Sequence, residues 1–166
     1  MELLLVYTKF PEGIFPVVYA KQNQREGEMH PLYEKASKLT ETVIGAAIEV
    51  QQIFGPGLLE SIYVKCLEHE LNLQGFSTQR ELPVTIHYKN IHFNHLLRVD
   101  LLVEDCLIIE AKAIDKDKED LEYYKAQTLS YMKLLDKPLG LVINFHNPRL
   151  GTRGIKRIIL KEADIP

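Results

Sequence analysis

Three ionisable residues lie on two apolar stretches near the middle of the chain, and their spacing suits metal-assisted chemistry. Asp100 lies in the first stretch, and Glu110 and Lys112 lie in the second, with only Ala111 between them. Placing carboxylates and an ammonium among Leu, Val and Ile side chains is costly unless they pair with one another or bind a metal. A divalent cation together with a phosphate group would offset that cost.

This set of residues favours the hydrolysis of a phosphodiester. Mg²⁺ held by one or two carboxylates keeps several waters, provides hydroxide near neutral pH and neutralises charge in the transition state. Asp100 and Glu110 are the expected carboxylate ligands, and the main-chain carbonyl of Ala111 is a third. Lys112 is expected to orient the attacking water and to stabilise negative charge. Whether it also acts as a base depends on how far the metal lowers its pKa. The alternative is a surface ion pair of Glu110 with Lys112 or Arg98 on a solvated sheet face.

The segment 96–113 predicts a β-hairpin that must bring the two acids onto one face. Side chains two apart on a strand share a face, so Glu110 and Lys112 project together. Residues opposite each other in an antiparallel pair also share a face. Asp100 therefore lies on the face of Glu110 only if the loop holds an odd number of residues. A three-residue loop at 104–106, or an equivalent bulge, is the prediction.

Residues on two predicted helices complete the candidate site. Gln127 and Tyr131 are four apart, with Tyr124 three residues earlier, so the three share one helix face. Their amide and phenol groups could hydrogen-bond a phosphate or position Lys112, and the alternative is a half-buried polar stripe. Glu60 falls in the first turn of another helix, where the dipole favours its charge. Its alternative role is that of a helix-end carboxylate with no ligand.

Hydrophobic patterning predicts the elements that carry these residues. A helical crossover before a buried strand indicates a mixed α/β or α+β fold. The predicted helices and strands are helices at 39–54, 58–73 and 115–135, strands at 81–88, 91–103, 106–113 and 139–145, and a short strand or helix at 155–160.

The ends and faces of the first two helices are marked by particular residues. Thr40 or Ser37 is expected to cap the first helix, and Gly75 is expected to end the second. The residues expected on or near the apolar face of the second helix are Leu59, Ile62, Cys66 and Glu70 or Leu71.

Length and composition are those of one ordinary globular domain, with 166 residues, 46% hydrophobic and 26% charged. The net charge of −3 provides no overall basic field, so phosphates of a nucleic acid must be met by metal or by a local cluster. The basic run from Arg149 to Lys161 is such a cluster. Cys66 and Cys106 lack CxxC spacing, and indicate a reducing, cytoplasmic compartment. No stretch is long enough to span a membrane.

Residues 1–28 differ from the rest of the chain. Their apolar clusters lack sustained periodicity and are interrupted by Pro11, Gly13 and Pro16, and a polar linker follows. We expect an extension outside the core, with residues 29–166 forming the domain. The alternative is an edge strand from Leu3 to Tyr7 that is added to the sheet.

Six motifs keep the order and spacing of a known family. They are GLLESIY from Gly57 to Tyr63, RVDLLVE, IIEAKA, AQTLSYM, LGLVINF and GIKRII. From about Leu39 to Leu160 the chain closely resembles the GxxExxY protein family, which is placed in the PD-(D/E)xK nuclease superfamily. The resemblance implies a restriction-endonuclease-like core, with a mixed central sheet flanked by helices.

The resemblance also assigns catalytic roles to residues already singled out: Asp100, Glu110, Lys112, Glu60, Gln127 and Tyr131. Glu60 would be the helix carboxylate that completes the metal site. Gln127 and Tyr131 match the QxxxY element of RecB-type nucleases. Tyr124 stands where many relatives have His, which leaves the role of that His open in this chain.

We therefore expect cleavage of nucleic acid, with DNA as the substrate and Mg²⁺ or Mn²⁺ as the cofactor. The alternative is a nucleic-acid-binding or protein-interaction module that keeps the fold without turnover, and a third hypothesis is an enzyme acting on another phosphate ester. The complete set of acids with Lys112 favours catalysis, since a binding module has no need of three costly polar groups on an apolar hairpin. The oligomeric state is left open.

Overall fold

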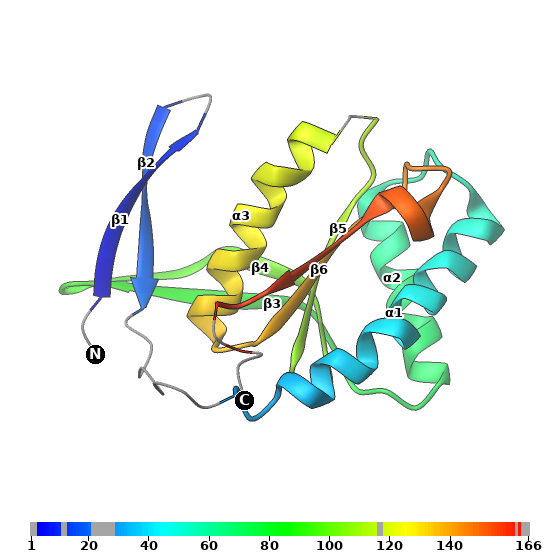
Figure 1. Cartoon of the computed structure of the whole chain (residues 1–166), viewed down its shortest axis with the longest axis horizontal. Coiled ribbons are helices and arrows are strands. Elements are labelled where there is room, and N and C mark those ends of the chain that lie inside the picture. The colour runs from blue at the N-terminus through cyan, green and yellow to red at the C-terminus, as the bar shows by residue number, and fades with distance from the viewer. Residues whose placement is uncertain (1–2, 11–12, 21–28, 116–117, 162, 164–166) are drawn as a thin grey trace.

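Five strands form the main sheet, in the order β3-β4-β5-β6-β7 (Figure 1). The computed structural model describes residues 3–10, 13–20, 29–115, 118–161 and 163. Neighbouring strands are antiparallel except β5 and β6, which run parallel. The strands are β3 Thr78–Tyr88, β4 Ile91–Val103, β5 Leu107–Lys112, β6 Leu139–Asn144 and β7 Ile155–Ile159.

The helices of the described chain lie on both faces of this sheet. α1 (Tyr33–Phe54) and α2 (Glu60–Leu73) pack on one face, and α3 (Lys118–Leu135) packs on the other. A short helical turn, η1 (Leu150–Gly154), precedes β7. None of the described helices combines the length and apolar character that a membrane span requires. The predicted mixed fold with a central sheet is confirmed.

β5 and β6 lie in the middle of the core, and every residue of both strands is buried. Burial on both faces explains their near-continuous apolar runs. Ile109 and Ala111 pack with α1 and α2, whereas Ile108 packs with α3. Alternation along β5 therefore places Glu110 and Lys112 on the α3 face, together, as their spacing predicted.

β4 and β5 form the predicted hairpin with a three-residue loop. Val103 pairs with Leu107, so residues 104–106 form the loop. Continuing this register toward the other end of the hairpin sets Asp100 opposite Glu110, on one face of the sheet. The loop length therefore places the carboxylates of Asp100 and Glu110 on one face, as the predicted site requires.

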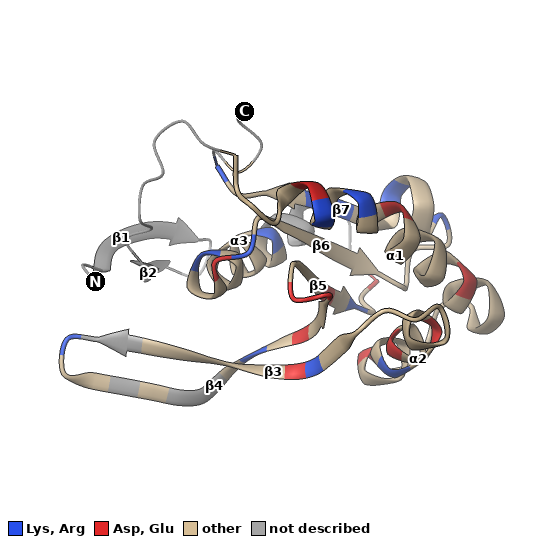
Figure 2. Ribbon diagram, turned by 90° about the horizontal axis from the view of Figure 1, so that it is seen from below, with Lys and Arg blue, Asp and Glu red and all other residues tan. Residues whose placement is uncertain are grey.

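β4 is much longer than the part of it that pairs with β5. It pairs with β5 only from Leu101 to Val103, whereas its pairing with β3 continues to Ile91. The β3–β4 hairpin thus extends beyond the rest of the sheet (Figure 2). Asp100 lies at the fork where β4 separates from β5, and backbone groups there need partners other than a neighbouring strand.

The N-terminal strands do not belong to the main sheet. β1 (Leu3–Phe10) and β2 (Gly13–Ala20) pair antiparallel as a separate two-stranded sheet. Residues 3–7 therefore lie in a strand, but not in an edge strand of the main sheet, which was the alternative prediction. The division of the chain after residue 28 stays a prediction.

The predicted start and cap of α1 are wrong. The helix begins at Tyr33, six residues before the predicted start, and its N-cap is Leu32, which makes no side-chain capping bond. Thr40 lies inside the helix, where its hydroxyl donates to the carbonyl of Ala36. The first turn is held by packing, because Ala36 is fully buried in the core. The prediction missed this first turn because it began the apolar pattern at Leu39.

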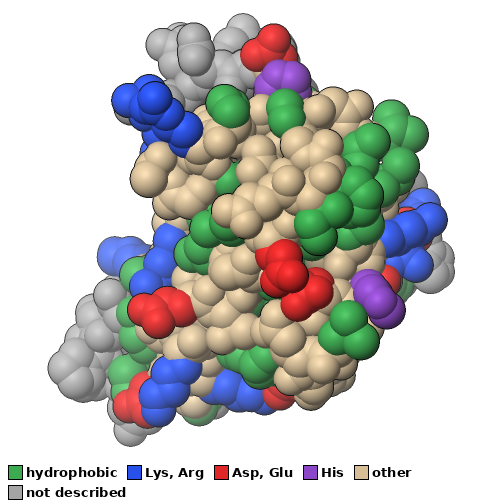
Figure 3. Space-filling model, turned by 90° about the vertical axis from the view of Figure 1, so that its right-hand side faces the viewer, with side chains coloured by type: hydrophobic (Ala, Val, Ile, Leu, Met, Phe, Trp, Pro, Cys, Tyr) green, Lys and Arg blue, Asp and Glu red, His purple; other side chains and the backbone are tan. Residues whose placement is uncertain are grey.

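The predicted apolar face of α2 is only partly right: Leu71 is buried and Cys66 packs against the core, whereas Leu59 and Ile62 are exposed. The buried residues of α2 are Tyr63, Val64, Leu67 and Leu71. Leu59 is 71% exposed and Ile62 39% exposed. Figure 3 shows the α1–α2 end of the molecule, where hydrophobic side chains lie at the surface among charged ones.

The remaining element ends differ from the predictions by a few residues. Gly75 follows the end of α2 with a φ of 86°, as expected of a glycine that ends a helix. β3 begins at Thr78, three residues before the predicted start, and α3 begins at Lys118. Residues 116–117 of the predicted third helix lie outside the described residues.

Candidate active site

The ammonium of Lys112 lies among three carboxylates. Its Nζ donates a hydrogen bond to Glu110 Oε1 at 2.8 Å and another to Glu60 Oε1 at 3.3 Å. Asp100 Oδ2 is 3.9 Å away, and the ring centroid of Tyr124 is 4.9 Å away. The structure therefore brings together four predicted site residues, from α2, β4 and β5.

Asp100 is held at the fork by the backbone of β5. Its Oδ2 accepts the N–H of Ala111 at 2.8 Å, so the carboxylate takes the place of the missing strand partner. The N–H and C=O of one strand residue point to the same edge. The carbonyl of Ala111 therefore also faces the fork, which is where its predicted role as a metal ligand requires it.

Glu60 reaches the cluster from the first turn of α2. Its side chain is 40% exposed, and the main-chain N–H of Ala113 is a further hydrogen-bond partner of the carboxylate. Partial burial raises its pKa, although the Lys112 ammonium acts in the opposite direction. Glu60 is thus the most solvent-exposed of the three acids, ahead of Asp100 at 25%.

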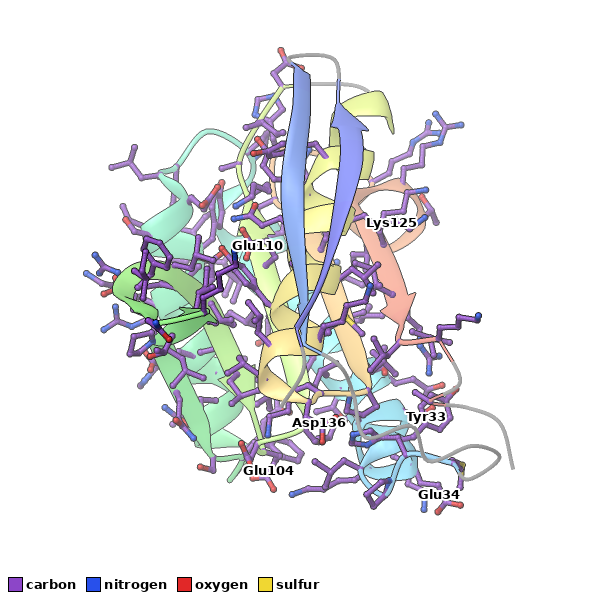
Figure 4. All side chains as sticks on the ribbon, turned by 90° about the vertical axis from the view of Figure 1, so that its left-hand side faces the viewer. Tyr33, Glu34, Glu104, Glu110, Lys125 and Asp136 are labelled. Carbon is purple, nitrogen blue, oxygen red and sulfur yellow. The ribbon has the colours of Figure 1, made fainter. Side chains whose placement is uncertain are left out.

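Glu110 is the buried acid of the cluster, and Figure 4 shows it between α3 and the β3–β4 hairpin. Burial, together with the negative charge of Asp100, raises the pKa of Glu110 to about 7, although Lys112 opposes the shift. Its Oε2 is buried and has no hydrogen-bond partner among the described residues. A buried carboxylate oxygen without a partner is costly, and a bound cation would satisfy it.

The pKa values of the two other central groups follow the same physics. Burial raises the pKa of Asp100, against the attraction of Lys112. Burial alone would lower the pKa of Lys112, but the surrounding carboxylates, Glu110 first among them, outweigh it and raise the pKa. Lys112 therefore remains a cation in this environment.

α3 covers the cluster with a hydrogen-bonded pair of polar side chains. Gln127 Nε2 donates to the hydroxyl oxygen of Tyr131 at 2.7 Å. Tyr131 is buried, which raises its pKa, and the charges of Glu110 and Asp100 act in the same direction. The two residues share one face of α3, and Tyr131 lies within electrostatic range of the cluster.

The donor set fits a divalent metal ion. Glu60, Asp100 and Glu110 provide hard carboxylate oxygens of the kind that Mg²⁺ and Mn²⁺ prefer. In the part of the chain that the structure describes, no three acidic, His or Cys side chains already form a metal cluster. We attribute this to Lys112, whose ammonium lies between the carboxylates. The unpartnered Oε2 of Glu110 nevertheless shows that the ammonium does not satisfy the whole set.

Tyr124, which was expected on the face of Gln127 as a phenol that could position Lys112, lies with its ring against the Lys112 ammonium. Sequence reasoning missed one contribution to the site. Buried Asn144, at the end of β6, accepts the N–H of Ile114 and donates to its carbonyl, which fixes the chain after β5. A polar residue closing an apolar strand was the available signal.

The proposed surface ion pair of Glu110 is only half present. Lys112 does bind Glu110, but in a buried setting. Arg98 pairs instead with Glu81, with 3.6 Å between Arg98 Nη1 and Glu81 Oε2. In the basic C-terminal run, Arg157 donates a hydrogen bond to Ser37 of α1, so part of that cluster links β7 to a helix.

A family model described as the PD-(D/E)XK nuclease superfamily matches residues 37–158. The matched range contains the whole acid cluster, Lys112 and α3, and it leaves out residues 1–28. A mixed sheet flanked by helices is consistent with the restriction-endonuclease-like fold of such proteins. No curated protein and no solved structure matches the chain.

Proposed function

Because the chain belongs to the PD-(D/E)XK nuclease superfamily, we propose that it is a metal-dependent nuclease that cleaves DNA. Nucleases of this superfamily generally use divalent metal ions and act on nucleic acid. The observation that carries the proposal is the buried, unpartnered Oε2 of Glu110 beside Asp100 and Lys112. This oxygen is buried, and no group of the described residues satisfies it.

The carboxylates of Asp100 and Glu110 and the carbonyl of Ala111 would hold the ion, with Glu60 as a direct or water-mediated ligand. When bound, a divalent ion of this kind provides a water of lowered pKa and neutralises charge on the phosphate. In the metal-free protein the surrounding carboxylates raise the pKa of Lys112, so this residue is a cation that would orient the attacking water and stabilise negative charge. A base role would require the bound ion to lower that pKa.

Gln127 and Tyr131 would bind a non-bridging phosphate oxygen. The Tyr131 hydroxyl oxygen already accepts a hydrogen bond from Gln127, so its own proton is available to another acceptor. Burial raises the pKa of Tyr131, which keeps that proton in place. The pair can therefore donate to an anion while remaining neutral.

The second candidate is a binding module that keeps the fold without turnover. The observation in its favour is the position of Lys112, whose ammonium lies between the acids that a metal would need. Against it, a module that only binds has no use for a buried acid with an unpartnered oxygen.

The test is a cleavage assay on linear, nicked and single-stranded DNA and on RNA, with Mg²⁺ or Mn²⁺. Wild type is expected to cleave DNA, and Asp100→Asn and Lys112→Met are expected to lose at least about 100-fold in rate. The matched control is Asp105→Asn, which neutralises an exposed acid in the loop of the same hairpin and should cleave as wild type does.

Two results would count against the proposal. Equal cleavage by wild type and both site variants would mean that a contaminant is responsible. Binding of nucleic acid without cleavage by wild type, under every metal condition, would favour the binding module. Cleavage of RNA in preference to DNA would keep the nuclease but change its substrate.

A further inference from the structure

Tyr63 is fully buried in α2, one turn after Glu60, and its hydroxyl closes the loop between α1 and α2. The hydroxyl donates to the carbonyl of Gly55 at 2.5 Å and accepts the N–H of Leu58 at 3.2 Å. These are main-chain groups at a helix end and in a loop, where no helical partner exists. One side chain thus fixes both ends of the short connection.

The loop that the Tyr63 hydroxyl closes has an unusual backbone conformation. Gly55 and Gly57 have φ values of 65° and 112°, a region that side-chain-bearing residues seldom adopt. The N-cap residue of α2, Leu59, makes no side-chain capping bond. Among the described residues, the side chain that binds the main chain just before the first turn of α2 is therefore Tyr63, through the N–H of Leu58. Glu60 lies in that first turn.

The ring of Tyr63 attaches α2 to the strand that carries the catalytic lysine. It stacks on Phe145 with ring centroids 4.6 Å apart and an angle of 5° between the planes. Phe145 follows β6, and its N–H donates to the main-chain carbonyl of Lys112 at 2.7 Å. One end of Tyr63 thus holds the loop that leads to Glu60, and the other end packs against the backbone beside Lys112.

Glu60 depends on this attachment more than the other acids do. Asp100 and Glu110 lie on adjacent strands of one hairpin, whereas Glu60 comes from a helix 52 residues from Lys112 in sequence. Residues three apart on a helix share a face, so fixing Tyr63 also fixes the direction in which Glu60 points.

We propose that Tyr63 is a positioning residue that holds Glu60 in the acid cluster, through its hydroxyl on the α1–α2 loop and its ring on Phe145. The importance of that position for catalysis rests on the proposed function. The position itself is a property of the metal-free protein, and it can be tested without metal or substrate.

The first test measures the coupling between Glu60 and Lys112 with a double-mutant cycle of Glu60→Gln and Lys112→Met. Chemical unfolding in EDTA provides the equilibrium constants, and the cycle is repeated on the Tyr63→Phe background. Tyr63→Phe keeps the ring and its stacking but removes the hydroxyl. The matched control background is Thr40→Val, which removes a buried hydroxyl that donates to Ala36 within α1.

We expect a coupling of about two- to fivefold in the unfolding constant for wild type and for Thr40→Val, as for other partly exposed ion pairs. On the Tyr63→Phe background the coupling should disappear, although the protein still folds. An unchanged coupling in Tyr63→Phe would show that Tyr63 is only structural. No coupling in wild type would equally overturn the proposal, because Glu60 would then not be held on Lys112.

The second test separates this inference from the proposed function. Titration with Mn²⁺ alone is expected to show binding about tenfold weaker in Tyr63→Phe than in wild type or Thr40→Val. The double variant Tyr63→Phe/Glu60→Gln should bind no more weakly than Glu60→Gln. If wild type shows the coupling but binds no Mn²⁺, the nuclease proposal fails and the role of Tyr63 stands. If wild type binds Mn²⁺ and Tyr63→Phe binds it equally well, the role of Tyr63 fails alone.

Discussion

The pKa of Glu110 is raised to about 7, because the carboxyl group is buried on β5 and lies near the negative charge of Asp100. Its Oε2 has no hydrogen-bond partner among the described residues. Which residues share its face could be predicted from sequence, since alternation along a strand is a local property. Its missing partner could not be predicted, because that depends on how α3 and β4 close around the side chain. Spacing placed Tyr124 where it could position Lys112, but the contact of its ring with the ammonium could not be predicted.

We predict that the metal-free protein loses stability between about pH 4.5 and pH 7. Burial raises the pKa of Glu110 from 4.5 to about 7, so in this window the folded state keeps a proton that the unfolded state has released. The unfolding free energy then falls as pH rises, by on the order of 3 kcal/mol for this group. The pKa values of Asp100 and Glu60 are raised too, so their contributions have the same sign.

Denaturant unfolding in EDTA at four pH values from 5 to 8 measures this effect. Glu110→Gln carries no titrating group at this position, so its curve should be flatter than that of wild type. The raised pKa of Lys112 affects stability only at alkaline pH, outside this window. Parallel curves for the two proteins would mean that Glu110 is ionised in the folded state throughout.

The packing of α3 on β6 decides how closely the helix approaches the site. Gly140 of β6 lies against α3, and a Cβ there would be 2.7 Å from Thr128 Cγ2 and 3.0 Å from Met132 Sδ. The Thr128 side chain is β-branched and has little freedom to move aside. The absence of a side chain at Gly140 thus allows the approach of the helix that carries Gln127.

Gly140→Ala is predicted to destabilise the protein by about 1–3 kcal/mol, because α3 has to move away from the sheet. Gly45→Ala is the control, since a Cβ at this exposed position in α1 meets nothing within 4 Å. That variant should be neutral or more stable by up to about 1 kcal/mol, as for other glycines replaced in helices. Chemical denaturation of both variants provides the comparison, and equal stabilities would contradict the close approach.

Element order was predictable from sequence, and element ends were less so. The strands at 91–103 and 139–145 carry patterns that extend over their whole length, and the structure has them at Ile91–Val103 and Leu139–Asn144. The start of α1 and part of the apolar face of α2 were wrong, because contacts with distant residues decide them. Ala36 is buried in the core, and the Tyr63 ring stacks on Phe145, far along the chain.

At the scale of the whole molecule, the family match and the main sheet both begin after residue 28. We predict that deleting residues 1–28 lowers the melting temperature by no more than a few degrees. A two-stranded hairpin is marginal on its own, and β1 and β2 do not pair with the main sheet. Thermal unfolding of both chains measures the change, and a large loss would show that these residues belong to the domain.

The grouping of the candidate site residues was largely predictable from the order and spacing of their motifs. Glu60, Asp100 and Glu110 all lie within 4 Å of the Lys112 ammonium, as that grouping requires. The number and kind of their mutual contacts were not predictable. They result from three elements that are brought together only when the sheet, α2 and α3 pack.

The position of the Lys112 ammonium among the acids has a consequence for how the protein would bind a metal ion. In the metal-free protein the ammonium of Lys112 serves as the counter-ion of the carboxylates. A metal ion bound as proposed would replace it in that role, and the displaced ammonium would remain attached to β5, beside the ion. Folding would then not depend on metal, because the charge of the carboxylates is already offset before the ion binds.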